Sequence, residues 1–151
     1  MTARHRLSLV FTLLCLAACS SSDSPTSPPP PPPPGGGGGG PVIKDNPGFA
    51  ADIQEIFNRK GCTASSCHGF SPGSEGLDLQ VGSSHSNLVN VAAQGTGGET
   101  RVIPGDAQNS YLIKKLEGRG VGARMPLGGT PLDNTDLTNI RNWINQGASN
   151  N

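Results

Sequence analysis

The chain has 151 residues, enough for one domain, and its 22 glycines and 14 prolines make it richer in turn-forming residues than most globular chains. Eleven basic side chains balance eleven acidic ones, so the composition supports neither a nucleic-acid-binding surface nor an acidic tail. Aromatic residues make up only 4%, and a domain of about 100 residues with so few large apolar side chains builds a modest core. A group other than protein would help to fill such a centre.

Residues 1–18 have the pattern of a secretory signal peptide. Two arginines precede an apolar run over residues 7–18, which is too short to span a bilayer because a spanning helix needs about 20 residues. The run ends in small residues directly before Cys19 and resembles the lipobox of bacterial lipoproteins, which implies cleavage there and a lipid on the thiol. We therefore expect a lipid-anchored protein of the cell envelope, at the outer membrane or the periplasmic face. An ordinary signal peptide followed by a stray cysteine is the alternative.

A disordered linker is expected over residues 19–46. It begins with serine, proline and threonine, continues as an unbroken proline run over residues 28–34, and then becomes a glycine run over residues 35–40. Consecutive prolines form a stiff polyproline II rod, whereas consecutive glycines behave as a flexible coil. This segment would act as a tether, and the folded domain would occupy residues 47–149.

The first two helices of this domain are predicted from their ends and their apolar spacing. Asn46 followed by a proline is typical of a helix start, and four apolar residues share one helical face before Gly61 ends the helix. Those apolar residues are Phe49, Ile53, Ile56 and Phe57. The second helix is expected over residues 107–117, with Asp106 as its cap, Gly118 as its stop and its apolar side chains buried.

The third helix has the clearest signals. Asp133 is a suitable N-cap, Asp136 lies near the positive end of the helix dipole, and Gly147 ends the helix. Its apolar stripe consists of Leu137, Ile140 and Ile144, flanked by Trp143. Between the first two helices, short apolar pieces at residues 77–79 and 88–91 are expected to form short strands or extended loops. The sequence thus predicts a small all-α domain with about three main helices and glycine-rich loops.

The candidate site follows the first helix directly. Cys62 and Cys67 are separated by four residues, and His68 comes immediately after the second cysteine. Covalent haem attachment needs two thiols that form thioethers with the vinyl groups and an adjacent histidine that ligates the iron, usually as Cys-x-x-Cys-His. Here the two extra residues would bulge outward. We expect one covalent haem c, held by Cys62 and Cys67 and ligated by His68.

Three other chemistries are open to this cysteine pair. A disulfide between Cys62 and Cys67 is compatible with a secreted chain. A zinc site would add His68 and His85 to the two thiols, although neighbouring ligands such as Cys67 and His68 rarely reach one tetrahedral ion. A thiol redox motif would have two intervening residues. The cysteine count favours haem, because the other two cysteines lie in the signal peptide and at the lipidation site.

Met125 is the expected second axial ligand of the iron. It is the only methionine left once the signal peptide is removed, and it lies in a loop with proline and glycine at residues 124–129. A thioether ligand raises the reduction potential of a haem. A methionine in the core would be the commoner use of this residue, but a Gly/Pro loop is not an apolar helical stripe. His85 is the alternative ligand, in a serine-rich stretch expected to be an exposed polar turn, and would give a lower potential.

Together these motifs resemble the planctomycete-type single-haem cytochrome c domain, over nearly all of residues 48–148. The resemblance rests on the order of Ile56-Phe57, Cys62 to His68, Gly76 to Leu79, Val102 to Asp106, Ser110 to Leu112, Met125-Pro126 and Trp143 to Ala148. It implies a class I-like cytochrome fold in which Cys62 and Cys67 are the thioether sites, His68 the proximal ligand and Met125 the distal ligand. The haem pocket that we expect from it is lined by Leu112, Leu116, Trp143 and Ile144.

The predicted function is electron transfer by a membrane-anchored c-type cytochrome, without catalysis. Both axial positions of the iron would be occupied, which leaves little room for a substrate, so the expected partners are redox proteins and not nucleic acid. The second ring nitrogen of His68 should donate to a backbone carbonyl, for which the stretch Ser71-Pro72 is the candidate. The alternatives are a peroxidase-like haem subunit with an open iron position and a haem-free, disulfide-closed module that binds a protein or a glycan.

Overall fold

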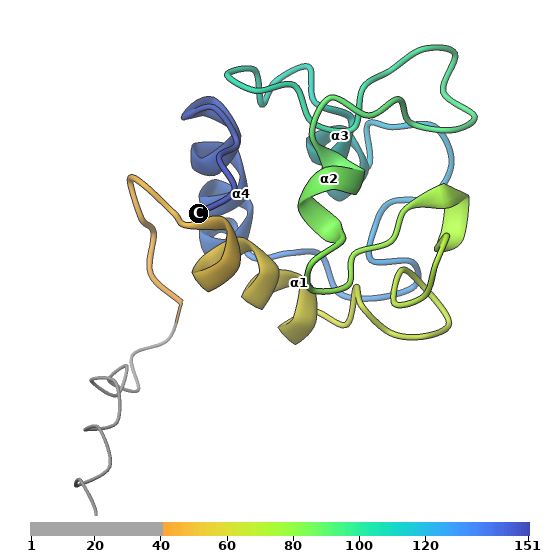
Figure 1. Ribbon diagram of the computed structural model, residues 1–151, viewed down its shortest axis with the longest axis horizontal. Coiled ribbons are helices and arrows are strands. Elements are labelled where there is room, and N and C mark those ends of the chain that lie inside the picture. Colours follow the sequence, from red (N-terminus) through yellow and green to blue (C-terminus); the bar gives the residue numbers. More distant parts are fainter. Residues whose placement is uncertain (1–40) are drawn as a thin grey trace, which may run out of the picture. The chain divides into compact units, whose positions relative to one another are not determined.

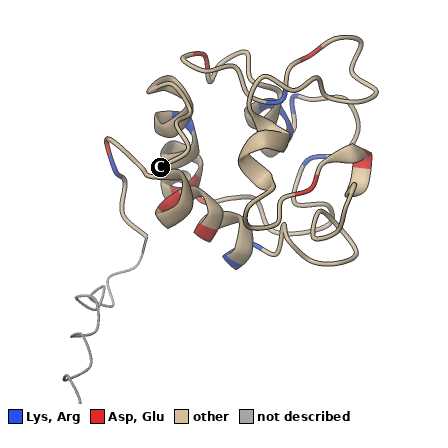
Figure 2. Cartoon of the chain, in the orientation of Figure 1, with Lys and Arg blue, Asp and Glu red and all other residues tan. Residues whose placement is uncertain are grey.

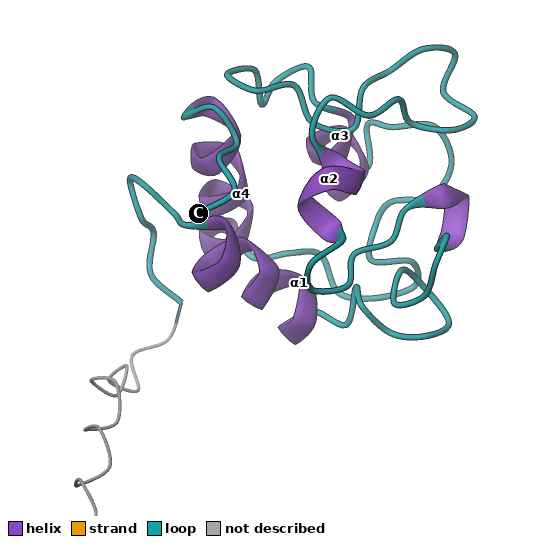
Figure 3. Ribbon diagram, in the orientation of Figure 1, coloured by secondary structure: helices purple, strands orange, loops and turns teal. Residues whose placement is uncertain are grey.

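The computed structural model describes residues 41–151. The expected signal peptide over residues 1–18, the lipidation site at Cys19 and the linker up to residue 40 lie outside the described residues. The described part is a small, mostly helical domain without strands, and its helices are joined by long loops (Figures 1 and 3). This confirms the predicted helical class with about three main helices. The elements in chain order are η1 (Phe49–Ile53), α1 (Gln54–Arg59), η2 (Ser74–Gly76), α2 (Ser84–Leu88), α3 (Tyr111–Glu117) and α4 (Asn134–Asn145).

The first helix, formed by η1 and α1 without a break, begins later than predicted. Its N-cap is Gly48 and not Asn46, which is exposed. The carboxylate of Asp52 accepts a hydrogen bond from the Gly48 N–H at 2.9 Å, so a side chain from inside the helix satisfies this free donor. The predicted apolar face is confirmed, because all four of its side chains are buried in the core.

The helix α2 lies where the sequence predicts loops, strands or an exposed turn. It is one and a half turns long and carries no repeating apolar pattern, so tertiary contacts hold it. Leu88 is completely buried, and the buried hydroxyl of Ser84 donates to the side-chain oxygen of Gln54 on α1. After α2, Val89 makes one isolated bridge to Val102, so the apolar piece at residues 88–91 forms no strand.

The second predicted helix, α3, is shorter than expected because its first residues form a separate turn. The carboxylate of Asp106 accepts from the backbone N–H of Asn109 at 3.0 Å and from its side-chain amide at 2.7 Å, which closes a turn instead of capping a helix. The helix then begins with Ser110 as its N-cap. Its predicted end is confirmed, since Gly118 adopts the left-handed conformation with φ of 76°.

The helix α4 matches its prediction closely. Asp133 is the N-cap, and its carboxylate accepts from the N–H of Asp136 at 2.9 Å. This hydrogen bond, together with the ammonium of Lys60, lowers the pKa of Asp133 to about 2. The apolar stripe faces the core, where α4 packs on η1 and α3. Its completely or almost completely buried members are Ile140, Trp143 and Ile144.

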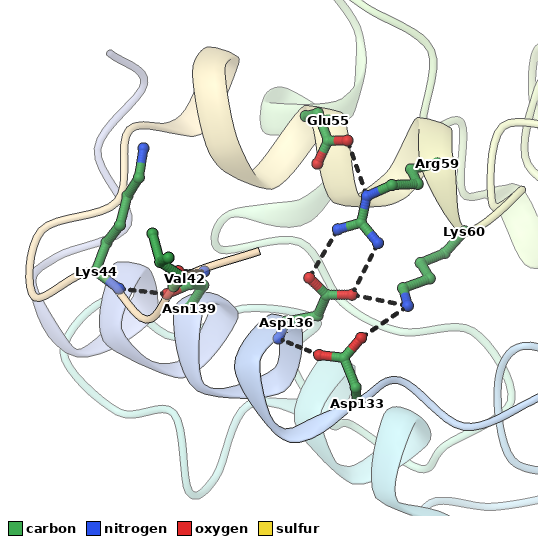
Figure 4. Close-up of polar contacts among 8 residues, drawn as sticks. All are labelled: Val42, Lys44, Glu55, Arg59, Lys60, Asp133, Asp136 and Asn139. Atoms are coloured by element: carbon green, nitrogen blue, oxygen red, sulfur yellow. Dashed lines mark hydrogen bonds and ion pairs between the residues drawn. The ribbon is translucent and has the colours of Figure 1, made fainter. Parts of the chain in front are cut away.

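A buried carboxylate joins the start of α4 to the end of α1. Asp136 is 0% exposed, and both of its oxygens accept from the guanidinium of Arg59, at 2.8 and 3.3 Å (Figure 4). The ammonium of Lys60 lies 2.9 Å from one of these oxygens and 2.9 Å from Asp133, and its pKa is raised chiefly by the hydrogen bond to Asp136. Glu55 completes the network at 2.9 Å from Arg59. The network fixes the residues that directly precede the cysteine pair.

The end of the predicted linker, residues 41–46, lies against α4. The side-chain amide of Asn139 accepts from the N–H of Lys44 at 2.8 Å and donates to the carbonyl of Val42 at 2.9 Å (Figure 4). Asn142 donates to the carbonyl of Lys44 at 2.8 Å. These amides satisfy backbone groups of an extended segment and so hold Val42 and Lys44 against α4.

Charged side chains of both signs are interspersed over the described part of the chain (Figure 2). Several form ion pairs with a residue of opposite charge, such as Lys114 with Glu99 and Arg141 with Glu117. Between residues 41 and 151, no helix combines the length and the apolar character that crossing a bilayer requires.

Candidate functional site

The cysteine pair and His68 lie in a tight series of turns that begins where α1 ends. The N–H of Cys67 donates to the carbonyl of Ala64 at 2.9 Å, and the N–H of His68 donates to the carbonyl of Cys62 at 3.2 Å. The two additional residues of the motif are therefore taken up in a turn. This turn brings the backbone of His68 back to the first cysteine.

The imidazole of His68 is oriented by a backbone carbonyl. Its Nδ1 lies 3.0 Å from the carbonyl oxygen of Leu77, which can only accept, so Nδ1 carries the proton. The carbonyl of His68 in turn accepts from the N–H of Leu79 at 2.7 Å. The partner is therefore Leu77 and not the stretch Ser71-Pro72. With Nδ1 engaged in this way, Nε2 is the nitrogen left to ligate a metal.

Two glycines allow the chain to fold this tightly around His68. A Cβ atom on Gly69 would lie 1.9 Å from the carbonyl oxygen of Thr63. A Cβ atom on Gly73, whose φ is 75°, would lie 1.9 Å from the carbonyl oxygen of Leu77, the group that orients the imidazole. Only glycine fits at either position without moving the backbone.

All four residues of the expected haem site line one cavity of about 760 Å³. This volume lies within the range of about 300–1,000 Å³ that is typical of ligand-binding pockets. Cys62 and Cys67 come from the loop after α1, and Met125 comes from a loop more than fifty residues later. Apolar walls are contributed by Phe57, Leu77, Leu88, Leu112, Leu116 and Pro126.

Part of the expected lining is elsewhere. Leu112 and Leu116 on α3 do line the cavity, whereas Trp143 and Ile144 on α4 lie in the core instead. The indole N–H of Trp143 donates to the carbonyl of Ser149 at 2.9 Å, and its ring packs against Phe49 at 5.1 Å between ring centroids. The apolar face of α4 is therefore used to hold the first helix.

His85, the alternative ligand, is not among the residues that line the cavity. It belongs to α2 and is half-buried, which corrects the expectation of an exposed turn. Its Nε2 lies 2.8 Å from the carbonyl oxygen of Ala148, and its ring meets Phe49 edge to face at 4.9 Å. These contacts hold the carboxyl-terminal segment, so His85 is engaged there, whereas Met125 lines the cavity.

The thiol chemistry of the pair also distinguishes the alternatives. Cys62 is half-buried and Cys67 is exposed, and both are free thiols. Burial raises the pKa of Cys62 to about 11, with a smaller contribution from Cys67. A redox-active thiol requires the opposite shift. Zinc gains no support, because the described residues contain no group of three or more histidine, cysteine, aspartate or glutamate side chains placed to hold a metal ion.

A buried arginine on the cavity wall is a feature that the sequence analysis missed. Arg101 is only 6% exposed, and its guanidinium donates to the carbonyls of Asn87, Glu75 and Gly76 at 2.8 to 3.0 Å. Within residues 41–151 it has no carboxylate partner within 4.0 Å, and burial lowers its pKa. A buried positive charge without a counter-charge, on the wall of a cavity, favours an anionic ligand there.

Comparisons of the chain with protein-family models, with curated proteins and with solved structures found no match. The chemistry of the cavity is therefore the basis for a functional conclusion. That chemistry consists of two thiols, an imidazole oriented by Leu77, the thioether of Met125 and the guanidinium of Arg101 around one volume.

Proposed function

We propose that this domain is a c-type cytochrome that carries one covalent haem and transfers single electrons. One observation carries the proposal. Met125, which is remote in sequence, lines the same cavity as Cys62, Cys67 and His68. The cavity wall thus combines two thiols with an imidazole and a thioether, which is the set that attaches a haem and ligates its iron on both sides.

Each residue has a defined role in this proposal. Cys62 and Cys67 hold the haem through thioether bonds to its vinyl groups, and His68 ligates the iron through Nε2 while Leu77 keeps its ring in orientation. Met125 would supply a thioether ligand, which favours the reduced state and raises the potential of a haem. When bound, the haem supplies an iron that changes between the ferrous and ferric states. The apolar wall of the cavity limits the access of water to it.

We infer the cellular location of the protein from its amino-terminal sequence. A signal peptide over residues 1–18, a lipid on Cys19 and the Pro/Gly-rich tether that follows would hold the cytochrome at the cell envelope, lipid-anchored at the outer membrane or the periplasmic face. Its partners would then be other redox proteins. The resemblance to the planctomycete-type single-haem cytochrome c domain supports the same function, and an iron held by both His68 and Met125 would favour an electron carrier over an enzyme.

Expression of the chain from residue 20 onward, in a host with cytochrome c maturation, tests the proposal directly. We expect a red protein whose mass exceeds that of the polypeptide by one haem and whose pyridine haemochrome has the spectrum of a haem with two thioether bonds. Replacement of both cysteines, Cys62→Ala with Cys67→Ala, should remove the added mass and the colour together. Ser65→Ala with Ser66→Ala, in the turn between them, is the matched control and should keep both.

Other results would identify the alternatives. A colourless protein two hydrogens lighter than its reduced mass would indicate a disulfide and end the cytochrome proposal. A red protein that binds carbon monoxide in the ferrous state without treatment would have an open iron position, as a peroxidase-like subunit requires. A six-coordinate iron with two protein ligands binds carbon monoxide poorly, so we expect no spectral change.

Arg101 is expected to supply a counter-charge for a carboxylate of the bound haem, since it is buried, lines the cavity and has no acidic partner within residues 41–151. Arg101→Gln should lower the midpoint potential by an amount on the order of tens of millivolts, because a positive charge near the iron favours the reduced state. Arg101→Lys keeps the charge and should keep most of the potential. Potentiometric titration measures both, and equal potentials for all three proteins would contradict this role.

A further inference from the structure

The loop that delivers Met125 to the cavity is organised around one side chain of α3. The ammonium of Lys115 donates to the carbonyl of Val121 at 3.0 Å and also to the carbonyl of Ala123. The carbonyl of Lys115 itself accepts from the N–H of Met125 at 3.0 Å. A single residue therefore contacts the loop at three points, the last of which is the expected ligand.

Neighbouring residues close the loop over the stem of this lysine. A Cβ atom on Gly120 would lie 2.9 Å from the Lys115 side chain and 3.1 Å from the ring of Tyr111, so glycine lets the chain pass close by. The hydroxyl of Tyr111 donates to the carbonyl of Val121 at 3.3 Å. The loop thus turns around the side chain of Lys115.

Few apolar contacts hold this loop. Val121 is 61% exposed and Leu127 is 71% exposed, so the side chains on both sides of Met125 bury little surface. The guanidinium of Arg124, the residue before Met125, donates to the carbonyls of Met125 and Gly129, both of which belong to the loop itself. Lys115 is therefore the charged side chain that links the loop to a helix, and hydrogen bonds from a charged donor are stronger than those between neutral groups.

We propose that Lys115 is a positioning residue for Met125, which holds the thioether at the cavity so that it can act as the second axial ligand. The inference rests on the proposed haem function. The ammonium of Lys115 joins the loop of Met125 to α3. Lys115 also lines the cavity, together with Leu112 and Leu116 of the same helix. Without the ammonium, the two loop carbonyls would be hydrated, and the loop would leave the iron more often.

The test compares the holoprotein with Lys115→Leu, which keeps an apolar side chain, removes the charge and the donors, and adds no new sulfur ligand. The first readout is the sulfur-to-iron charge-transfer absorption of the ferric protein, which reports methionine ligation. The second is the affinity of the ferric protein for imidazole, which competes with the methionine. We expect a weaker absorption and imidazole binding that is about tenfold tighter, as for the loss of one charged hydrogen bond.

Two variants separate positioning from general effects. Lys115→Arg keeps a charged donor and should restore the absorption and bring the imidazole affinity within about threefold of the wild type. Lys114→Leu makes the same change at a lysine of the same helix that pairs with Glu99 and does not line the cavity, so it should match the wild type. If Lys115→Leu does not accumulate as holoprotein, Lys115→Gln, which removes the charge but keeps a neutral donor, serves in its place.

The outcomes are distinguishable from a failure of the proposed function. A wild-type protein with no haem, or with haem but no sulfur-to-iron absorption, would overturn the haem function or the Met125 ligation, and this inference with it. A wild-type protein that has the absorption, together with Lys115→Leu protein of equal absorption and equal imidazole affinity, would overturn only the role of Lys115.

Discussion

Met125→Leu is expected to open one face of the iron, so that the ferrous protein binds carbon monoxide where the wild type does not. Leucine fills a similar volume but has no lone pair to donate. Met125→His would restore a ligand of another kind, and we expect it to lower the midpoint potential by about 0.1 V or more, a fraction of the range of about 0.8 V over which axial ligands tune haems. Carbon monoxide difference spectra and potentiometric titration measure the two effects.

Two further variants make this prediction specific to Met125. Leu127→Ala changes a largely exposed residue of the same loop that also lines the cavity, and should leave six-coordination and the potential near those of the wild type. His85→Asn tests the alternative ligand and should likewise leave the spectrum unchanged, because His85 is bound to the Ala148 carbonyl away from the cavity. If His85→Asn opened the iron and Met125→Leu did not, the ligand assignment would be reversed.

The fold could be predicted from the sequence where the signals are local. The helix α4 has an acidic N-cap, an apolar stripe and a terminal glycine within its own residues, and all three were readable. The helix α2 has none of these, because the burial of Leu88 and the hydrogen bond from Ser84 to Gln54 stabilise it through distant residues. The early turn at Asp106 has the same capping chemistry as a helix start, and the sequence does not distinguish the two.

The candidate site divides in the same way. Cys62, Cys67 and His68 form a linear motif, and Met125 stands out because the only other methionine in the sequence is Met1. The groups around them act across gaps in the sequence: the Leu77 carbonyl is nine residues from His68, and the carbonyls that hold Arg101 are up to 26 residues away. The one sequence signal for the burial of Arg101 was its position directly before the apolar pair Val102-Ile103.

Asp136→Asn is expected to have the largest effect on folding, a loss of about 2–4 kcal/mol in the free energy of unfolding. The carboxylate is 0% exposed and is the common acceptor of Arg59 and Lys60, whereas an amide would present a donor to these donors. The side chains of Arg59 and Lys60 are 36% and 23% exposed, so water recovers part of their hydration, and the loss falls short of that for a fully enclosed pair. Urea unfolding of the holoprotein, followed by circular dichroism, measures it.

Asp133→Asn is the matched control for this change. It makes the same substitution one helical turn earlier, also removes a charge beside Lys60, and keeps an effective N-cap because asparagine caps helices about as well as aspartate. Its side chain is 48% exposed, so we expect a loss below about 0.5 kcal/mol. Equal losses for the two variants would mean that surface charge, and not the buried junction of α1 with α4, accounts for the stability.

The same experiment relates the junction to the site. Arg59 and Lys60 end the helix from which the loop of Cys62 and His68 starts, and Lys60 lines the cavity. Because the proposed haem would be joined covalently to this loop, loosening the junction should weaken the orientation of His68 by Leu77 as well as the packing of the helices. We therefore expect the visible absorption of the Asp136→Asn holoprotein to change over the same range of urea as its circular dichroism. In a contrary result, the circular dichroism of the variant would change at lower urea than that of the wild type, while its visible absorption would change only at the urea concentration that unfolds the wild type. That result would show that the loop of Cys62 and His68 folds independently of the junction.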